Sequence, residues 1–152
     1  HNEVLKCIHL TLCNKSVQKD LENWDLSVQE VEVNENIEIR VDTRIKTDIK
    51  IQHNRPDLFV YDKKRKEITL IEVGITNLDL LTQVENEKNR KYDLIANELA
   101  LSYKCKVKII PYVMTWEGLD TKYYKKHRNE IGIKLKHTSN HYLSKRLLRP
   151  CP

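Results

Sequence analysis

Two short apolar runs separated by a charged connection set the strongest limit on how this chain can fold. The runs cover residues 58–61 and 68–75, are rich in β-branched and aromatic side chains, and flank the polar segment 62–67. This pattern predicts a β-hairpin. The second run is apolar enough for a strand that is covered on both faces, yet it contains Glu72.

A carboxylate inside such a strand needs compensation, because burying an unpaired charge is costly. Asp57 begins the first strand of the hairpin and Glu72 lies late in the second, so antiparallel pairing brings both side chains to the same end of the sheet. One or two carboxylates, completed by water and phosphate oxygens, are a usual binding site for Mg²⁺. We therefore expect Asp57 and Glu72 to hold Mg²⁺, with Mn²⁺ as a substitute.

The segment that follows the hairpin supplies the cations. Residues 78–103 are predicted to form a helix, with Thr76 or Asn77 as its cap, and its apolar stripe comprises Leu81, Val84, Tyr92, Ile95 and Leu99. Lys88 falls inside this stripe, and Lys91 lies about 60° to one side of it. A lysine in such a place commonly extends to the rim of the core. The acids on the adjacent strands favour a Lys88 side chain that reaches the metal site, with Lys91 at its rim.

The remaining apolar patterns predict further strands. Val31 and Val33 are followed by isoleucine or valine at odd positions between residues 37 and 51, which indicates half-buried strands. This run is too long for one strand, so we expect a break between Asp42 and Asp48, two acids that we assign to a solvated face. Residues 104–114 should form a strand parallel to the second hairpin strand, and Pro111 favours an edge or a bulge.

Together these elements predict an α/β domain with a mixed sheet of about four to five strands flanked by helices. At 152 residues the chain suits a single domain. Residues 1–12 are predicted to form an amphipathic helix, and residues 120–131 a second, basic helix. Residues 120–152 form a basic C-terminal extension whose tyrosines and cations suit stacking on bases and contact with phosphates, although a solvated helix face has the same composition.

Composition narrows the function further. Lys and Arg outnumber Asp and Glu by 27 to 22, a net charge of +5 that suits a polyanionic partner. The four cysteines have no spacing typical of a zinc site. No apolar run is long enough to span a bilayer, so we expect no membrane partner. Because the chain begins at His1 and ends on RPCP, we expect a segment excised from a larger polyprotein.

The hairpin and the helix carry a resemblance. Pro56-Asp57, fourteen intervening residues and Glu72 resemble the PD-(D/E)xK nuclease pattern, and more narrowly the restriction-like endonuclease domain of site-specific non-LTR retrotransposons. Gly74 replaces the lysine that this superfamily usually carries two positions after the second acid. The retrotransposon branch is similar in carrying its lysine on the following helix, within an EKxxKY-like motif, and residues 87–92 read EKNRKY. The resemblance covers about residues 1–115 and implies an αβββαβ restriction-endonuclease-like core.

This resemblance implies a Mg²⁺-dependent endonuclease that nicks DNA. Asp57, Glu72 and the backbone carbonyl of Val73 would hold the metal, and Lys88 and Lys91 would bind phosphate. Tyr92 belongs to the same motif, but its place on the apolar stripe favours packing over catalysis. Glu3 resembles the first-helix acid that many nucleases of the superfamily point at the metal, and it is equally explained as a carboxylate at a helix N-terminus. His1-Asn2 resembles the remnant of a basic-His-Asp motif.

The implied partners are a double-stranded DNA target and the flanking reverse transcriptase and DNA-binding domains of the parent protein, in the nucleus. The nick would leave a 3′ hydroxyl that primes reverse transcription. Two other functions remain open from the sequence. Gly74 favours a nuclease-like module that has lost cleavage and only binds nucleic acid, while a resolvase or repair nuclease of the same superfamily would select branched DNA.

Overall fold

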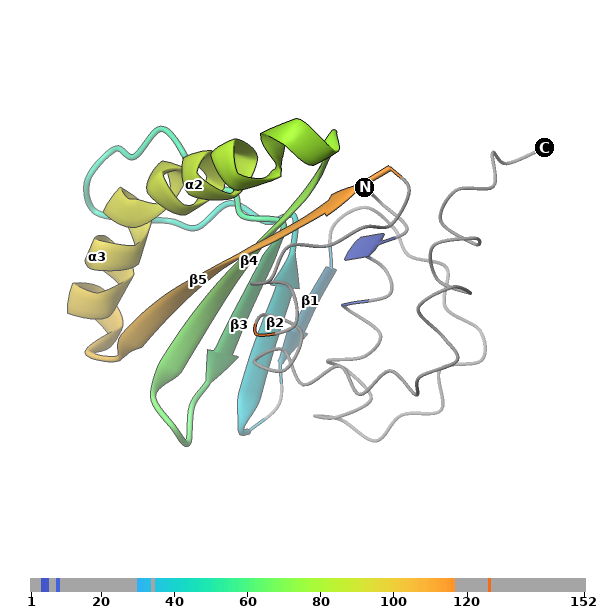
Figure 1. Ribbon diagram of the computed structural model, residues 1–152. Helices are drawn as coiled ribbons and strands as arrows, with labels where there is room; N and C mark the ends of the chain where they lie inside the picture. The colour runs from blue at the N-terminus through green and yellow to red at the C-terminus, as the bar shows by residue number, and fades with distance from the viewer. Residues whose placement is uncertain (1–3, 6–7, 9–29, 34, 117–125, 127–152) are drawn as a thin grey trace, which may run out of the picture.

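The computed structural model describes residues 4–5, 8, 30–33, 35–116 and 126. Within these residues the chain forms a mixed β-sheet with a bent helix packed on one face (Figure 1). The structure is therefore of the α/β class, as predicted from the sequence.

Five strands make up this sheet, and they lie in the order of the sequence. They are β1 (Glu30–Val33), β2 (Ile37–Val41), β3 (Leu58–Asp62), β4 (Glu67–Thr76) and β5 (Lys106–Thr115). β1 to β4 pair antiparallel, which confirms the predicted hairpin, and β5 pairs parallel to β4 at the edge of the sheet. Pro111 therefore lies on an edge strand, as expected for a residue without a backbone N–H.

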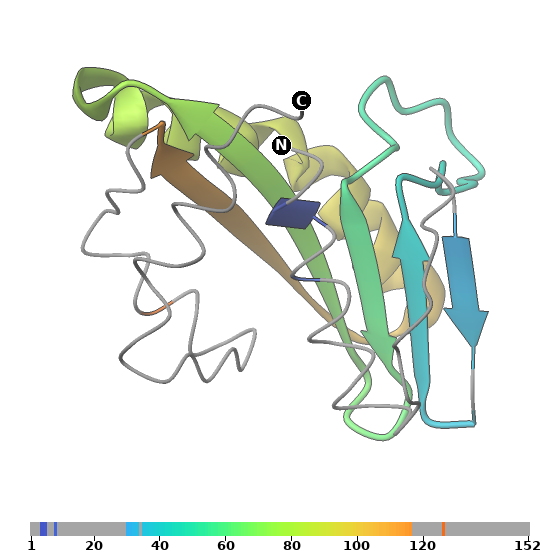
Figure 2. The same cartoon turned by 90° about the vertical axis from the view of Figure 1, so that its right-hand side faces the viewer.

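Side chains alternate between the two faces of the sheet, and both faces are covered. Figure 2 shows the helical residues near the N-terminus in front of the sheet and the bent helix behind it. In the front layer Ile71, Val73, Ile110 and Tyr112 form one apolar cluster with Val4, Leu5 and Ile8. In the back layer Ile68 and Leu70 pack with Tyr92, Ile95 and Leu99. Since Glu72 is in phase with Ile68 and Leu70, it lies on the helix-bearing face.

The segment between β2 and β3 corrects one prediction. The expected break is present, because β2 ends at Val41, but no strand forms over residues 49–51. The chain instead folds back on itself: Asp42 has a positive φ of 49°, and the N–H of Ile45 donates to the carbonyl of Asn54 at 2.7 Å. Ile45 and Ile51 reach the core from this loop, whereas Ile49 is 57% exposed.

The predicted long helix is present in three parts. A 3₁₀ turn, η1 (Leu78–Leu80), precedes α2 (Leu81–Lys91) and α3 (Asp93–Tyr103), and the helix bends at Tyr92. The predicted stripe is confirmed, since Leu81, Tyr92, Ile95 and Leu99 are buried and Val84 is partly buried. Asn77 occupies the N-cap position of η1, but its side chain makes no capping hydrogen bond, contrary to expectation.

Several predictions concern residues outside the described part. Val4, Leu5 and Ile8 are helical and buried, in agreement with the predicted N-terminal helix, whereas His1, Asn2 and Glu3 lie outside the described residues. Of the predicted basic extension only Lys126 is described, and it is helical and exposed. Among the described helices, none has the length and hydropathy needed to cross a membrane.

Two leucines on α3 test the orientation of this helix. Leu99 is 1% exposed and Leu101 is 75% exposed. Leu99→Ala should lower the free energy of unfolding by about 2–5 kcal/mol, because it leaves a cavity against the sheet. Leu101→Ala removes the same atoms from the surface and should change it by less than about 0.5 kcal/mol. Urea denaturation of both variants measures the difference, and equal losses would contradict the observed packing.

Candidate active site

Asp57 is held at the point where β3 begins. The last residue pair between β3 and β4 is Leu58 opposite Ile71. The next N–H of β4 on the side that faces β3 is that of Val73, and it lies beyond the end of β3. The carboxylate of Asp57 accepts this N–H through Oδ2 at 2.8 Å. The backbone carbonyl of Asp57 in turn accepts the N–H of Asp42 at 2.9 Å, which ties the loop before β3 to the end of β2.

Glu72 lies beside Asp57, deep in the sheet. Its side chain is on the helix-bearing face and the residue is only 5% exposed. Oε2 accepts the backbone N–H of Asp57 at 3.3 Å. The carboxylate of Asp57 therefore accepts the N–H of the residue after Glu72, and the carboxylate of Glu72 accepts the N–H of Asp57. The structure thus brings the two acids together at one end of the sheet.

Two lysines from α2 converge on the same carboxylate oxygen. The Nζ atoms of Lys88 and Lys91 lie 3.1 and 3.0 Å from Oε1 of Glu72. The Lys88 side chain is 19% exposed and that of Lys91 is 37% exposed, so Lys88 is the deeper of the two, as the helical phase predicts. Lys91 lies at the rim, as expected, but its side chain also reaches Glu72 directly.

These ammonium groups determine the charge state of Glu72. Burial raises the pKa of the carboxyl, but the attraction of Lys88 and the charge and hydrogen bond of Lys91 outweigh it, so the pKa is lowered from its ordinary value of 4.5. Glu72 is therefore ionised at neutral pH although it is buried. The two carboxylates and the two ammonium groups cancel formally, so a divalent cation bound beside them would leave the site positively charged.

Gly74 leaves the space that Lys88 occupies. A Cβ atom at Gly74 would lie 2.7 Å from Cε and 3.3 Å from Cδ of Lys88, and 3.2 Å from Cγ2 of Val113. Contacts under about 3 Å cannot form, so the lysine reaches Glu72 by passing over a strand residue without a side chain. Gly74 is also the position at which the resembled pattern has its usual lysine. The ammonium group of Lys88 therefore reaches Glu72 from α2, through the space that the missing side chain of Gly74 leaves.

Tyr92 joins the site through its hydroxyl but is not available for proton transfer. The residue is 1% exposed, and its hydroxyl donates to the carbonyl of Arg55 at 3.0 Å. Burial, and then the negative charges of Glu72, Asp57 and Asp42, raise the pKa of the phenol well above its usual range. Tyr92 remains protonated and anchors the loop that carries Asp57, in agreement with the packing role that the apolar stripe favours.

Sequence reasoning missed the support that Arg55 provides. Its Nη2 lies 2.6 Å from Oδ2 of Asp42, and its Nε donates to the carbonyl of Asp42 at 3.0 Å. Asp42, expected on a solvated face, is thus half-buried and paired, whereas Asp48 is exposed as expected. Only the position of Arg55 directly before Pro56-Asp57 could have drawn attention to it.

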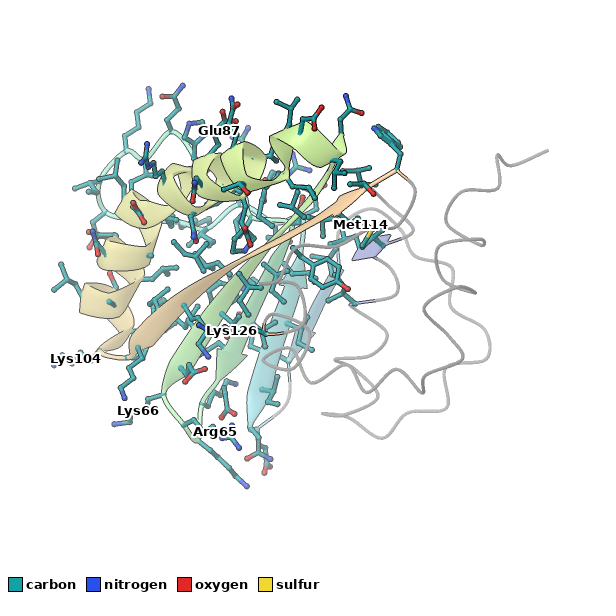
Figure 3. The ribbon with its side chains drawn as sticks, in the orientation of Figure 1. Arg65, Lys66, Glu87, Lys104, Met114 and Lys126 are labelled. Atoms are coloured by element: carbon teal, nitrogen blue, oxygen red, sulfur yellow. The ribbon has the colours of Figure 1, made fainter. Side chains whose placement is uncertain are left out.

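Two further residues of the predicted motif and metal site have different outcomes. Glu87 begins the EKxxKY-like motif, but it is on the outer side of α2 (Figure 3), where it accepts a hydrogen bond from Gln83 at 2.9 Å. Glu3 is outside the described residues. Glu85, which was not predicted as a site residue, is buried one turn before Lys88. Within the described ranges no three His, Cys, Asp or Glu side chains are grouped as metal ligands.

The donors that are present nevertheless fit Mg²⁺. This ion is commonly bound by one or two carboxylates, with water and substrate phosphates filling the other positions. Asp57 and Glu72 supply the carboxylates. The carbonyl of Val73 leaves β4 on the same side as its N–H, which faces Asp57, so the predicted backbone ligand is on the correct side of the strand.

Substitution of Gly74 tests the path of Lys88. Gly74→Ala should displace the flexible end of the lysine from Glu72, because the new Cβ would overlap Cε. The pKa of Glu72, followed by NMR of its labelled carboxyl carbon, should rise, and the free energy of unfolding at neutral pH should fall by about 1.4 kcal/mol for each pKa unit. In a Lys88→Ala background the same substitution should leave that pKa unchanged. An unaltered Glu72 pKa in the single variant would show that Lys88 takes another path.

The ion pairs of Glu72 should also make stability depend on pH. Because the folded pKa lies below the ordinary value of 4.5, this contribution is complete above pH 4.5 and is lost as the pH falls through the folded pKa. Urea midpoints measured from neutral to acidic pH should therefore fall less steeply for Glu72→Gln than for the unmodified chain. Glu87→Gln, at an exposed carboxyl on α2, is the matched control and should keep the original slope.

No protein-family model matches this chain, and no curated protein matches its sequence. The chemistry of the site must therefore be inferred from its geometry. That geometry consists of two adjacent carboxylates, two ammonium groups on one of their oxygens, and a glycine that admits the deeper lysine.

Proposed function

We propose that this chain is a metal-dependent endonuclease that hydrolyses phosphodiester bonds of DNA with Mg²⁺ at Asp57 and Glu72. The single observation that carries the proposal is the position of Glu72. It is a buried, ionised carboxylate in a central strand, in contact with a second acid and with two lysines. Buried charges that are brought together in this way are concentrated at functional sites.

The arrangement of elements supports the finer fold assignment. After the helical residues near the N-terminus, β2, β3 and β4 form an antiparallel meander, and the bent helix then leads to β5, which is parallel to β4. This order supports an αβββαβ restriction-endonuclease-like core, in which β1 would be an additional strand. The acids lie where β3 ends beside β4, and the lysines on the helix that follows. Fold alone does not establish activity, so the proposal depends on the site.

The proposed reaction adds water across one phosphodiester bond. The water oxygen bonds to phosphorus, the bond from phosphorus to the 3′ oxygen breaks, and that oxygen gains a proton to become a 3′ hydroxyl. Mg²⁺ bound by Asp57, Glu72 and the Val73 carbonyl would lower the pKa of a bound water and neutralise phosphate oxygens. Lys88, whose ammonium group is held by Glu72, would balance the charge that develops on the phosphate.

Each supporting residue then has a definite task. Lys91, at the more exposed side of Glu72, would orient the phosphate, and its Nζ also lies 4.9 Å from the centre of the Tyr92 ring. Tyr92 and Arg55 would keep the loop before β3 in place, and with it Asp57. In the parent protein, we propose that the nick primes reverse transcription of a non-LTR retrotransposon, with a double-stranded DNA target and a nuclear location.

A second candidate is a nucleic-acid-binding module that does not cleave. The observation in its favour is that both lysines already bind Oε1 of Glu72, which is the contact that a purely structural ion-pair cluster would also make. Under that function DNA affinity would be independent of Mg²⁺ and no nicking would occur. A resolvase or repair nuclease of the same superfamily would instead cut branched DNA in preference to linear duplex.

Nicking of a supercoiled plasmid in Mg²⁺ tests the proposal. Asp57→Asn and Lys88→Ala should each lower the rate by about 10²-fold or more, because each removes charge that acts on the reacting phosphate. Both variants should keep the circular dichroism spectrum of the unmodified chain. Lys91→Ala should have a smaller effect than Lys88→Ala, since Lys91 lies nearer the solvent.

Asp48→Asn and Lys46→Ala provide matched controls at exposed positions of the loop before β3, and both should nick at the unmodified rate. Retained nicking in Asp57→Asn would exclude the proposed site. The absence of nicking in the unmodified chain, together with tight DNA binding, would favour the binding module.

A further inference from the structure

A group of cations lies at the end of the sheet away from Glu72. The turn between β3 and β4 contains Lys63, Lys64, Arg65 and Lys66. The turn between α3 and β5 contributes Lys104, and β5 begins with Lys106. Figure 3 shows Arg65, Lys66 and Lys104 together at this end, with Glu87 of α2 at the other. The sequence alone points to the C-terminal extension for nucleic-acid contacts, and it does not single out this group.

The two turns are joined into one structure. The N–H of Lys106 donates to the carbonyl of Lys66 at 3.0 Å, and β5 begins opposite Glu67 at the start of β4. Lys66 and Lys104 both have positive φ angles, of 52° and 50°. These conformations are uncommon for lysine, and they mark tight turns whose backbones are held by the sheet. The cations therefore project from an ordered edge of the sheet.

Between the turns is an open hollow of about 380 Å³, lined by Arg65, Lys66, Lys104 and Lys106 together with one acid, Glu67. Ala100 of α3 also lines it, so it lies on the helix-bearing side of the sheet, as does Glu72. The volume is sufficient for one or more phosphate groups with their water.

The charge of this hollow is not compensated within the described structure. Glu67 is already paired with Lys108, at 3.2 Å. Nε of Arg65 lies 3.8 Å from Oδ2 of Asp62, but the Arg65 side chain is 83% exposed. Ion pairs at such exposed positions contribute little to stability. Among the described residues, Lys66, Lys104 and Lys106 have no carboxylate within ion-pair distance. The hollow therefore presents several ammonium groups to an anion.

We propose that this hollow binds the phosphate backbone of nucleic acid. The class of anion rests on the proposed nuclease function. Glu67 precedes Glu72 by five positions in β4, so at ~3.3 Å per residue the hollow is about 17 Å from the candidate active site. A DNA duplex carries about one charge per 1.7 Å of its axis. A duplex with one phosphate at Glu72 thus has others within reach of the hollow, which would hold the substrate while it is cut.

Salt-dependent binding tests this site. The triple variant Lys66→Gln/Lys104→Gln/Lys106→Gln is made in the whole chain, with Asp57→Asn in both parent and variant so that DNA remains uncut. Fluorescence anisotropy with a labelled duplex then gives Kd between about 50 and 200 mM salt. The slope of log Kd against log salt should fall by about 0.9 for each phosphate that the variant no longer binds, or about 2 to 3 in total. The affinity at low salt should fall more than about tenfold.

The control removes the same charge elsewhere. Arg44→Gln/Lys46→Gln/Lys50→Gln changes three exposed cations of the loop between β2 and β3, and its slope should match that of the parent. An unchanged slope in the first triple variant, an equal loss in both, or no DNA binding by the parent would overturn the proposal. If the chain without Asp57→Asn binds DNA but never nicks it, the proposed function fails while this binding site stands.

Discussion

The ion pairs of Glu72 are the interaction on which the rest of this structure depends. A carboxylate with 5% exposure in an interior strand of the sheet would be strongly destabilising without partners. Lys88 and Lys91 keep it charged, and to do so they fix the rotation of α2 against β4. This rotation also determines which apolar residues of the helix are buried, because Leu81 and Tyr92 face the sheet when Lys88 does. Burial of one charge thereby orients the helix, the sheet and the acid of the neighbouring strand.

The ends of the strands around this charge determine how the second acid is held. β4 continues past the start of β3, and the N–H of Val73 that is left over binds Asp57. The loop between β2 and β3 closes on the same place, through Asp42, Arg55 and the hydroxyl of Tyr92. The second acid is therefore held by a backbone N–H that the sheet leaves unused, and its loop is fixed by the side chains of Arg55 and Tyr92.

Much of this arrangement could be predicted from local patterns. Antiparallel pairing of the hairpin strands places Asp57 and Glu72 at one end of the sheet, and helical phase determines that Lys88 faces them. Ile45 and Ile51 could not be placed, because alternating isoleucines look the same in a strand and in a loop that folds back onto the core. The interactions of Lys91 and Arg55 were missed, since a long side chain can reach a partner that ideal phase angles do not indicate. The role of Gly74 depends on the contact between β4 and α2, and the local sequence pattern of either element does not reveal that contact.

The space above Gly74 has a consequence for how such a site can change over time. Strand position 74 and helix position 88 compete for one volume, so only one of them can contain a long side chain. A sequence with a lysine at strand position 74 would need a shorter residue at helix position 88, and a lysine at position 88 needs a residue without a side chain at position 74. The two positions should therefore vary together across descendants of this chain, with a lysine at one of them and a small residue at the other.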